Sequence, residues 1–205
     1  APSDACAETY EAHPDCKGKV HVANFGVDSE LFHPAEKSPE DFRLVYSGGN
    51  IIRKGLWYLV KAWNELKLQD GLLTLLSTDQ YSTSWRTASH GWVPDEQVPI
   101  YLRNSSVFCL PSLEEGQALV CLEAMASGLP VIVTHETGAP IEDGKEGLIV
   151  PSRDISKLKE AIEYFHKNPG EIKRMGANAR AKAEQMTWSK FGERVVEICE
   201  EVASR

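Results

Sequence analysis

Short apolar runs alternate along the chain with segments of helical periodicity. Six runs predict strands, four of them nearly continuous in apolar residues, as is typical of strands covered on both faces of a sheet. The predicted strands are Val20–Ala23, Arg43–Ser47, Leu72–Leu76, Val107–Pro111, Val131–Thr134 and Leu148–Val150.

Helical spacing fills the gaps between these strands. Apolar residues recur at i, i+3, i+4 and i+7 over Gly55–Leu66, and a second helix is predicted over Gln117–Ser127, ended by Gly128 and Pro130. Strand–helix–strand alternation predicts an α/β fold, a Rossmann-like open parallel sheet with helices on both faces. Ligands bind such sheets at the carboxyl ends of the strands and at helix N-termini.

The pattern changes to helix alone after Val150. Three helices and their starting residues are predicted: Ile155–Lys167 capped by Asp154, a helix opened by Pro169, and Trp188–Ala203 capped by Thr187. The last helix carries an apolar stripe of Phe191, Val195, Ile198 and Val202. That stripe predicts either packing against the sheet or docking on a partner domain.

Composition narrows the class of protein. The chain has 205 residues, of which 42% are hydrophobic and 25% charged, which is ordinary for a soluble globular domain. A net charge of −8 argues against nucleic-acid binding. The sequence has no transmembrane-length apolar run and no signal-peptide pattern. Because it begins at Ala1 and reads like mid-protein sequence, we expect a domain of a longer, cytoplasmic protein.

Cysteines and histidines indicate neither disulfides nor a metal site. The five cysteines form no C-x-x-C pair, so we expect them to be reduced structural residues. The six histidines are dispersed, and we predict no metal ligand among them. His135 follows a predicted strand, so it is either a residue of the ligand cleft or an ordinary loop histidine.

The most informative segment runs from Val107 to Val133. A buried strand ends at Pro111, and a polar turn containing Glu115 opens a helix whose free amides and partial positive charge suit a diphosphate. Glu123 lies eight residues after Glu115, about 12 Å along a helix at ~1.5 Å per residue. Carboxylates at both ends suit the hydroxyls of a ribose and a hexose. The alternative is a helix-terminal charge and a solvated glutamate.

Several segments together resemble one known family. EGQALVCLEAMASGLPVI resembles the Glu–seven–Glu motif of the large group 1 family of retaining glycosyltransferases, which have the GT-B fold of two facing Rossmann-like domains. Four further blocks, in the family's order, resemble its C-terminal, donor-binding domain: NFGVDSELFHP, SGGNIIRKG, HGWVP and THETGAPIEDGKEGLIVPSRD. Between them they span most of Val20 to Asp154.

The resemblance implies a division of the chain and a function. Residues 1–19 would lead in from an N-terminal domain, residues 20–186 would bind a nucleotide-diphosphate sugar, and residues 187–205 would form a helix that docks on that N-terminal domain. The full protein would transfer a hexosyl group with retention to an acceptor glycan, lipid or small molecule, in polysaccharide or glycolipid synthesis. We expect a uridine donor and no cofactor or metal.

The resemblance also assigns roles to residues. Arg53 and Lys54 would hold the diphosphate and stabilise it as it leaves, Glu115 would bind the donor sugar, and Glu123 the ribose. Arg53, Lys54 and Glu115 would be the catalytic residues. Further donor contacts would come from Gly48, Gly49, Asn50, Trp92, Val93, Gly116, Gln117, Ala118, Leu119 and Val120, with Trp92 and Val93 near the base. Without the neighbouring motif, Arg53-Lys54 would read as a solvated basic pair, Gly48-Gly49 as a simple turn and Trp92 as a core aromatic.

Three departures from the family limit this transfer of roles. Gln117-Ala118 stands where the family has Phe-Gly, and the passages Ser77–His90 and Ala139–Glu142 are short. Two other functions remain open: a nucleotide-sugar epimerase, which needs a base able to deprotonate the sugar ring, and a non-catalytic nucleotide-sugar-binding module.

Overall fold

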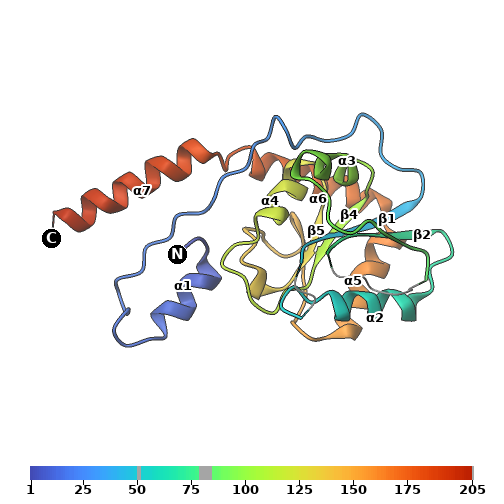
Figure 1. Cartoon of the computed structure of the whole chain (residues 1–205), viewed down its shortest axis with the longest axis horizontal. Helices are drawn as coiled ribbons and strands as arrows, with labels where there is room; N and C mark the ends of the chain where they lie inside the picture. The colour runs from blue at the N-terminus through green and yellow to red at the C-terminus, as the bar shows by residue number, and fades with distance from the viewer. Residues whose placement is uncertain (50–51, 79–84, 205) are drawn as a thin grey trace.

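The computed structural model of the chain describes residues 1–49, 52–78 and 85–204, and its centre is a parallel sheet (Figure 1). The strand order is β3-β2-β1-β4-β5-β6, and every neighbouring pair is parallel. The strands are β1 (Phe42–Ser47), β2 (Gly71–Leu76), β3 (Thr87–Ser89), β4 (Val107–Leu110), β5 (Val131–Val133) and β6 (Gly147–Ile149). The predicted Rossmann-like α/β fold is therefore confirmed.

Helices cover both faces of this sheet. Helix α2 (Leu56–Leu66) packs against α5 (Ile155–Lys167) on one face, and α4 (Leu119–Ala126) packs against α6 (Pro169–Ala183) on the other (Figure 1). All four residues of β4 are buried, as are all three of β5. The continuous apolar runs of these strands thus reflect cover on two sides.

One predicted strand is wrong. The segment Val20–Ala23 is extended but pairs with no strand, because it lies outside the sheet, in the part of the chain between α1 (Asp4–Glu11) and β1 (Figure 1). Its backbone instead bonds to the first residue, with Ala23 N donating to the carbonyl of Ala1. The periodicity also missed several short elements: α1 (Asp4–Glu11), β3, η1 (Asp95–Gln97), α3 (Val98–Arg103) and η2 (His135–Thr137).

The predicted helix starts after Val150 are confirmed. The side chain of Asp154 accepts from Lys157 N at 2.9 Å, and that of Thr187 accepts from Lys190 N at 3.2 Å. Pro169 occupies the first turn of α6, where its missing N–H leaves no helical hydrogen bond unmade.

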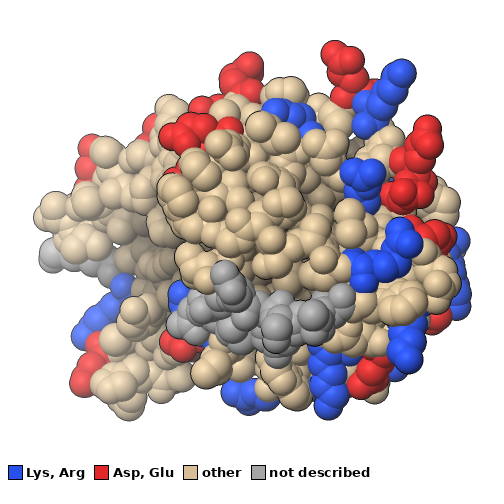
Figure 2. All heavy atoms as spheres, turned by 45° about the vertical axis from the view of Figure 1, so that its right-hand side comes forward, with Lys and Arg blue, Asp and Glu red and all other residues tan. Residues whose placement is uncertain are grey.

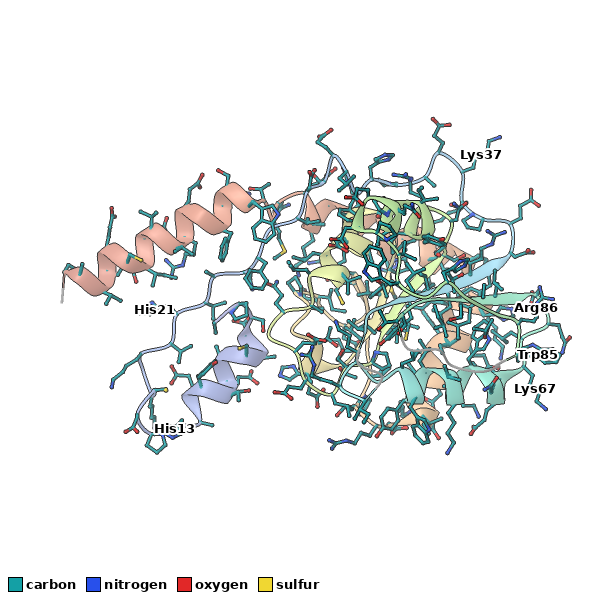
Figure 3. The ribbon with its side chains drawn as sticks, in the orientation of Figure 1. His13, His21, Lys37, Lys67, Trp85 and Arg86 are labelled. Carbon is teal, nitrogen blue, oxygen red and sulfur yellow. The ribbon has the colours of Figure 1, made fainter. Side chains whose placement is uncertain are left out.

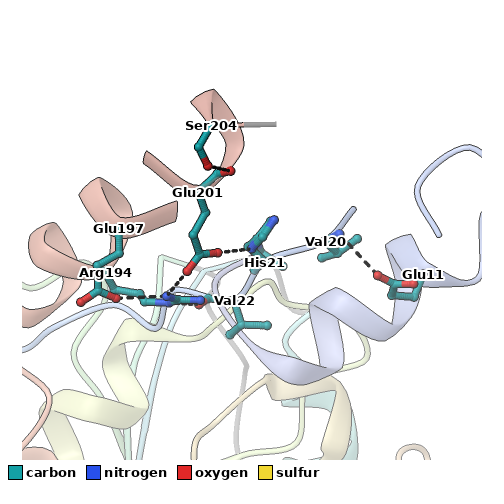
Figure 4. Close-up of polar contacts among 9 residues, drawn as sticks. Glu11, Val20, His21, Val22, Arg194, Glu197, Glu201 and Ser204 are labelled. Atoms are coloured by element: carbon teal, nitrogen blue, oxygen red, sulfur yellow. Dashed lines mark hydrogen bonds and ion pairs between the residues drawn. The ribbon is translucent and has the colours of Figure 1, made fainter. Parts of the chain in front are cut away.

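Helix α7 (Trp188–Ala203) does not pack against the sheet, so that expectation is wrong. It has no buried residue and projects from the body of the molecule (Figure 1). Its contacts are with the extended segment before the sheet: Phe25 packs on Trp188 and Phe191, and Arg194 Nε donates to the carbonyl of Val22. The close-up shows Glu201 bridging Arg194 and His21 (Figure 4). Docking of α7 on a further domain stays a prediction.

Charged side chains are mixed on the surface. In the view of Figure 2, Lys and Arg are interspersed with Asp and Glu and gather into no large basic patch among the residues drawn in colour. Over the described ranges, none of the helices has the length and apolar character needed to cross a membrane.

Candidate functional site

The loop after β1 is pressed against the carboxyl end of β4. Gly55 has φ +70°, and a Cβ there would lie 1.9 Å from the carbonyl oxygen of Pro111, so only glycine fits. Next to it, Leu113 N donates to the carbonyl of Arg53 at 2.7 Å. These two backbone contacts place Arg53 and Lys54 beside the turn that follows β4.

Both cations meet Glu115 in that turn. Lys54 Nζ lies 3.0 Å from Glu115 Oε1, and Arg53 Nη1 lies 3.4 Å from Oε2. The Glu115 side chain is only 9% exposed and that of Lys54 17%, whereas Arg53 is 43% exposed. A Cβ on Gly48 would lie 2.5 Å from Cδ of Lys54, so this glycine makes room for the lysine stem. The predicted cluster of Arg53, Lys54 and Glu115 is brought together.

The turn leads into a helix N-terminus at the same edge of the sheet. Helix α4 begins at Leu119, two residues later than predicted, and Ala118 is its N-cap without a side-chain hydrogen bond. The amide of Ala118 donates to the carbonyl of Thr137 and is used within the protein. The amides of Gln117 to Leu119 were expected near the sugar and phosphates, and that of Ala118 is thus committed elsewhere. Leu119 and Val120 lie in the first turn of α4, where backbone amides have no partner within the helix. The adjoining Gly116 accepts from the Ser3 hydroxyl.

Glu123 lies on α4 and is partly buried. Burial, together with the smaller effect of the Asp95 carboxylate, raises its pKa to about 7 against the opposing effect of Lys54. Of the cluster of Arg53, Lys54 and Glu115, Lys54 thus acts electrostatically on Glu123. The interpretation of Glu123 as a solvated surface glutamate does not fit this environment.

A small hollow lies next to the cluster, between the carboxyl ends of β1 and β2 and the segment before η1. It has a volume of about 150 Å³ and includes Gly48, Gly49, Trp92, Val93 and Asp95 in its lining. Trp92 is 70% exposed and Val93 is buried, so Trp92 is not a core aromatic. The position of Asn50, also assigned to donor binding, lies outside the described residues.

Gln117, which departs from the family pattern, points away from solvent. Its Oε1 accepts from Phe25 N at 2.7 Å, and its side chain is 6% exposed. Its buried Nε2 has no hydrogen-bond partner among the described residues. The side chain of Gln117 therefore ties the turn to the extended segment before the sheet, on which α7 packs.

Sequence reasoning missed the residues beneath the turn. Thr134 caps η2 and Thr137 is its last residue, and their buried hydroxyls donate to the carbonyls of Ser112, just after β4, and Leu110, at its end. A Thr-x-x-Thr capping pattern after a predicted strand was the available signal. His135 lies between them, lines a different hollow and pairs with Glu8 of α1 at 3.0 Å.

Metal-ligating side chains are scattered. Within the described ranges, no group of three or more His, Cys, Asp or Glu residues is arranged to hold a metal ion. Figure 3 shows His13 and His21 on the N-terminal segment, at the opposite end of the molecule from Trp85 and Arg86. All five cysteines are free, and burial raises the pKa of the Cys109 and Cys121 thiols well above the usual range.

The geometry suits recognition of an anion that also carries hydroxyl groups. Two cations and the start of a helix can hold phosphate oxygens. A buried carboxylate between the cations can accept hydrogen bonds from hydroxyls. The hollow beside exposed Trp92 offers a planar surface for an aromatic ring.

Comparison with known proteins agrees with this geometry. The sequence profile of a family described as glycosyl transferases group 1 matches residues 28–182. A relative, the MMP alpha-(1->4)-mannosyltransferase of Mycolicibacterium hassiacum, is 27% identical over 204 residues, covering 91% of this chain and 49% of that protein. The alpha-maltose-1-phosphate synthase of Mycolicibacterium smegmatis is 27% identical over 98% of this chain and 61% of its own length. The chain therefore spans about half the length of the curated relatives it matches.

Solved structures share the fold. HepE of Anabaena, solved in complex with UDP and glucose, has a TM-score of 0.84 at 18% identity, covering 98% of this chain and 62% of that one. The C-terminal domain of LpcC from Francisella tularensis has a TM-score of 0.67 at 20% identity, covering 76% of this chain and 95% of that one. The fold is that of one half of a GT-B glycosyltransferase.

Proposed function

Because the chain belongs to the glycosyl transferases group 1 family, we propose that it binds the nucleoside-diphosphate sugar from which the full protein transfers a hexosyl group. The observation that carries this proposal is the cluster of Arg53, Lys54 and Glu115 beside the first turn of α4. It joins phosphate-binding groups to a hydroxyl acceptor at the edge where ligands bind parallel sheets.

Lys54 and Arg53 hold the diphosphate, together with the amides of Leu119 and Val120. They stabilise the negative charge that develops as the bond between sugar and phosphate breaks. Glu115 accepts hydrogen bonds from hydroxyls of the donor sugar, and Glu123 accepts them from the ribose. The base lies in the hollow beside Trp92 and Val93. No metal is required, because two cations and the helix N-terminus face the phosphates.

The acceptor is held by a further domain, and its hydroxyl attacks the face that the leaving group vacates, which retains the anomeric configuration. A role in polysaccharide or glycolipid synthesis and a cytoplasmic location fit this reading. The names of relatives support transfer of sugars, since they include a mannosyltransferase and glycosyltransferases of colanic acid and amylovoran biosynthesis. HepE, a neighbour in fold, was solved with UDP-glucose, which supports a uridine donor.

Calorimetric titration of this chain with UDP-, GDP- and ADP-glucose tests the proposal. We expect saturable binding of at least one of them, undiminished by EDTA, and no appreciable transfer of its sugar to added acceptors. Absence of binding to all three would defeat the proposal. Efficient transfer by this chain alone would show that the acceptor site is not on another domain.

The two rival functions make different predictions. An epimerase would convert the donor to its epimer in the absence of acceptor, which nuclear magnetic resonance of the sugar would detect. A binding module would hold the donor, and the full-length protein would leave it intact with every acceptor offered. The closeness of both cations to Glu115 favours transfer, because a leaving diphosphate needs that charge.

A further inference from the structure

Two buried threonines lie beneath the turn that carries Glu115. Thr134, which is 1% exposed, is the N-cap of the short helical turn η2, and Thr137, which is fully buried, is its last residue. Thr134 N donates to Thr137 Oγ1 at 3.3 Å, so the two residues close a reciprocal cap on η2. Neither residue belongs to the set of ligand contacts proposed above.

Their hydroxyls join η2 to the carboxyl end of β4. Thr134 Oγ1 donates to the carbonyl of Ser112 at 2.6 Å, and Thr137 Oγ1 donates to that of Leu110 at 3.1 Å. The two hydroxyl oxygens lie 3.0 Å apart, so two protons serve three contacts. Both strands β4 and β5 thus end in one buried polar network, whose members depend on each other.

The backbone of η2 then holds the turn itself. Glu115 N donates to the carbonyl of Glu136 at 2.9 Å, and Ala118 N donates to that of Thr137 at 3.1 Å. Gly138 follows with φ +63°, and a Cβ there would lie 2.6 Å from the carbonyl oxygen of Gly116. The turn from Ser112 to Ala118 is therefore built on η2 by hydrogen bonds and by close backbone contact.

We propose that Thr134 and Thr137 are positioning residues that fix the Glu115 carboxylate where it meets Lys54, and through it set the recognition of the donor sugar. This inference rests on the proposed function for its ligand. The two threonines act without touching the donor, since their hydroxyls face the carbonyls of Ser112 and Leu110. Replacing either hydroxyl with a methyl group leaves a buried carbonyl without its donor and frees the turn to shift.

The test compares the variants Thr137→Val and Thr134→Val with Thr137→Ser, which keeps the hydroxyl. Thr74→Val is the matched control, because Thr74 is a buried threonine of β2 outside the network. For each protein, titration gives the ratio of affinities for the nucleoside-diphosphate glucose that binds and for the same nucleoside diphosphate without sugar. We expect each valine variant to lower this ratio by about tenfold, equivalent to one lost hydrogen bond. Thr137→Ser and Thr74→Val should keep it.

Amide hydrogen exchange supplies a readout that needs no ligand. In Thr137→Val the amides of Glu115 and Ala118 should exchange faster than in the wild type, while those of β1 and β2 do not. An unchanged affinity ratio together with unchanged exchange at these two amides would overturn the inference. Failure of the wild type to bind any donor would instead refute the proposed function. In that case hydrogen exchange at Glu115 and Ala118 would still test whether the threonines fix the turn.

Discussion

The ammonium of Lys54 lies 3.0 Å from the carboxylate of Glu115, and both side chains are mostly shielded from water. The charge of each is therefore compensated by the other before any ligand arrives. A diphosphate that binds Lys54 takes over part of this role and releases the carboxylate to accept hydrogen bonds from a sugar. The proposed phosphate and sugar sites would thus be coupled through one ion pair.

Removing the lysine charge should weaken phosphate binding specifically. We expect Lys54→Met to lower the affinity for the nucleotide sugar by about 10- to 100-fold, since a hydrogen bond to a charged group contributes about 1.5–3 kcal/mol. Affinity for the bare nucleoside should fall much less, and calorimetry on both ligands measures the difference. Lys61→Met is the control, because Lys61 lies over the ring of Trp57 at 5.0 Å. Equal losses for both ligands would remove Lys54 from the phosphate site.

Glu123 should make stability depend on pH. Burial raises its pKa from 4.5 to about 7, so between these values the folded chain holds a proton that the unfolded chain releases. The contribution of Glu123 to the free energy of unfolding should therefore fall as pH rises from about 4.5 to about 7.

The variant Glu123→Gln isolates this contribution, because other titrating groups cancel in the difference between the two proteins. Relative to the variant, the wild type should lose stability as pH rises from about 4.5 to about 7, measured by urea unfolding. A difference that stays constant with pH would mean that Glu123 titrates as an exposed glutamate.

Gly55 should tolerate no side chain. Gly55→Ala combines a left-handed backbone, which costs about 1–2 kcal/mol for other residues, with a clash against the carbonyl of Pro111. We expect a loss of more than that amount in the free energy of unfolding, and weaker donor binding because Arg53 and Lys54 move. Gly192→Ala in α7 meets nothing within 4 Å and should be neutral or slightly stabilising. Equal stabilities of the two variants would contradict the strain at Gly55.

Arg180 should contribute to stability and not to ligand binding. Its Nη1 donates to the carbonyls of Ser29, Phe32 and Ala126 at 3.1, 2.8 and 2.7 Å, which joins α6 to two other segments. We expect Arg180→Met to lower the free energy of unfolding by about 2–3 kcal/mol, because three carbonyls lose a charged donor. Lys173→Met, an exposed change on the same helix, should cost little. Donor affinity of the folded Arg180→Met protein should match the wild type.

The sheet was largely predictable from the sequence because its strands are buried on both faces. Five of the six predicted runs became β1, β2, β4, β5 and β6. The run at Val20–Ala23 is also apolar, but a strand forms only where a neighbouring strand accepts its hydrogen bonds. The pattern of a single segment does not show whether such a neighbour is present. Thr87–Ser89 became β3 although it is polar, since its partner β2 supplies the ladder.

The residues of the candidate site were also predictable only in part. Arg53, Lys54 and Glu115 were identified from their spacing and motif, and the resemblance placed them together. Thr134 and Thr137 were missed because their role depends on hydrogen bonds to Ser112 and Leu110, which only the pairing of β4 with β5 brings within reach. The orientation of Gln117 toward Phe25 likewise depends on the path of a distant segment.

The order of strands in the sheet also has consequences for folding kinetics. Leu44 at the centre of β1 pairs with Leu73 of β2 on one side and with Val107 of β4 on the other. The first pairing closes the short crossover through α2. The second closes a much longer loop, which contains all the elements from α2 to α3. Contacts that close long loops slow folding. We therefore expect the unit of β1, α2 and β2 to form before the edge of the sheet at which Lys54 and Glu115 meet.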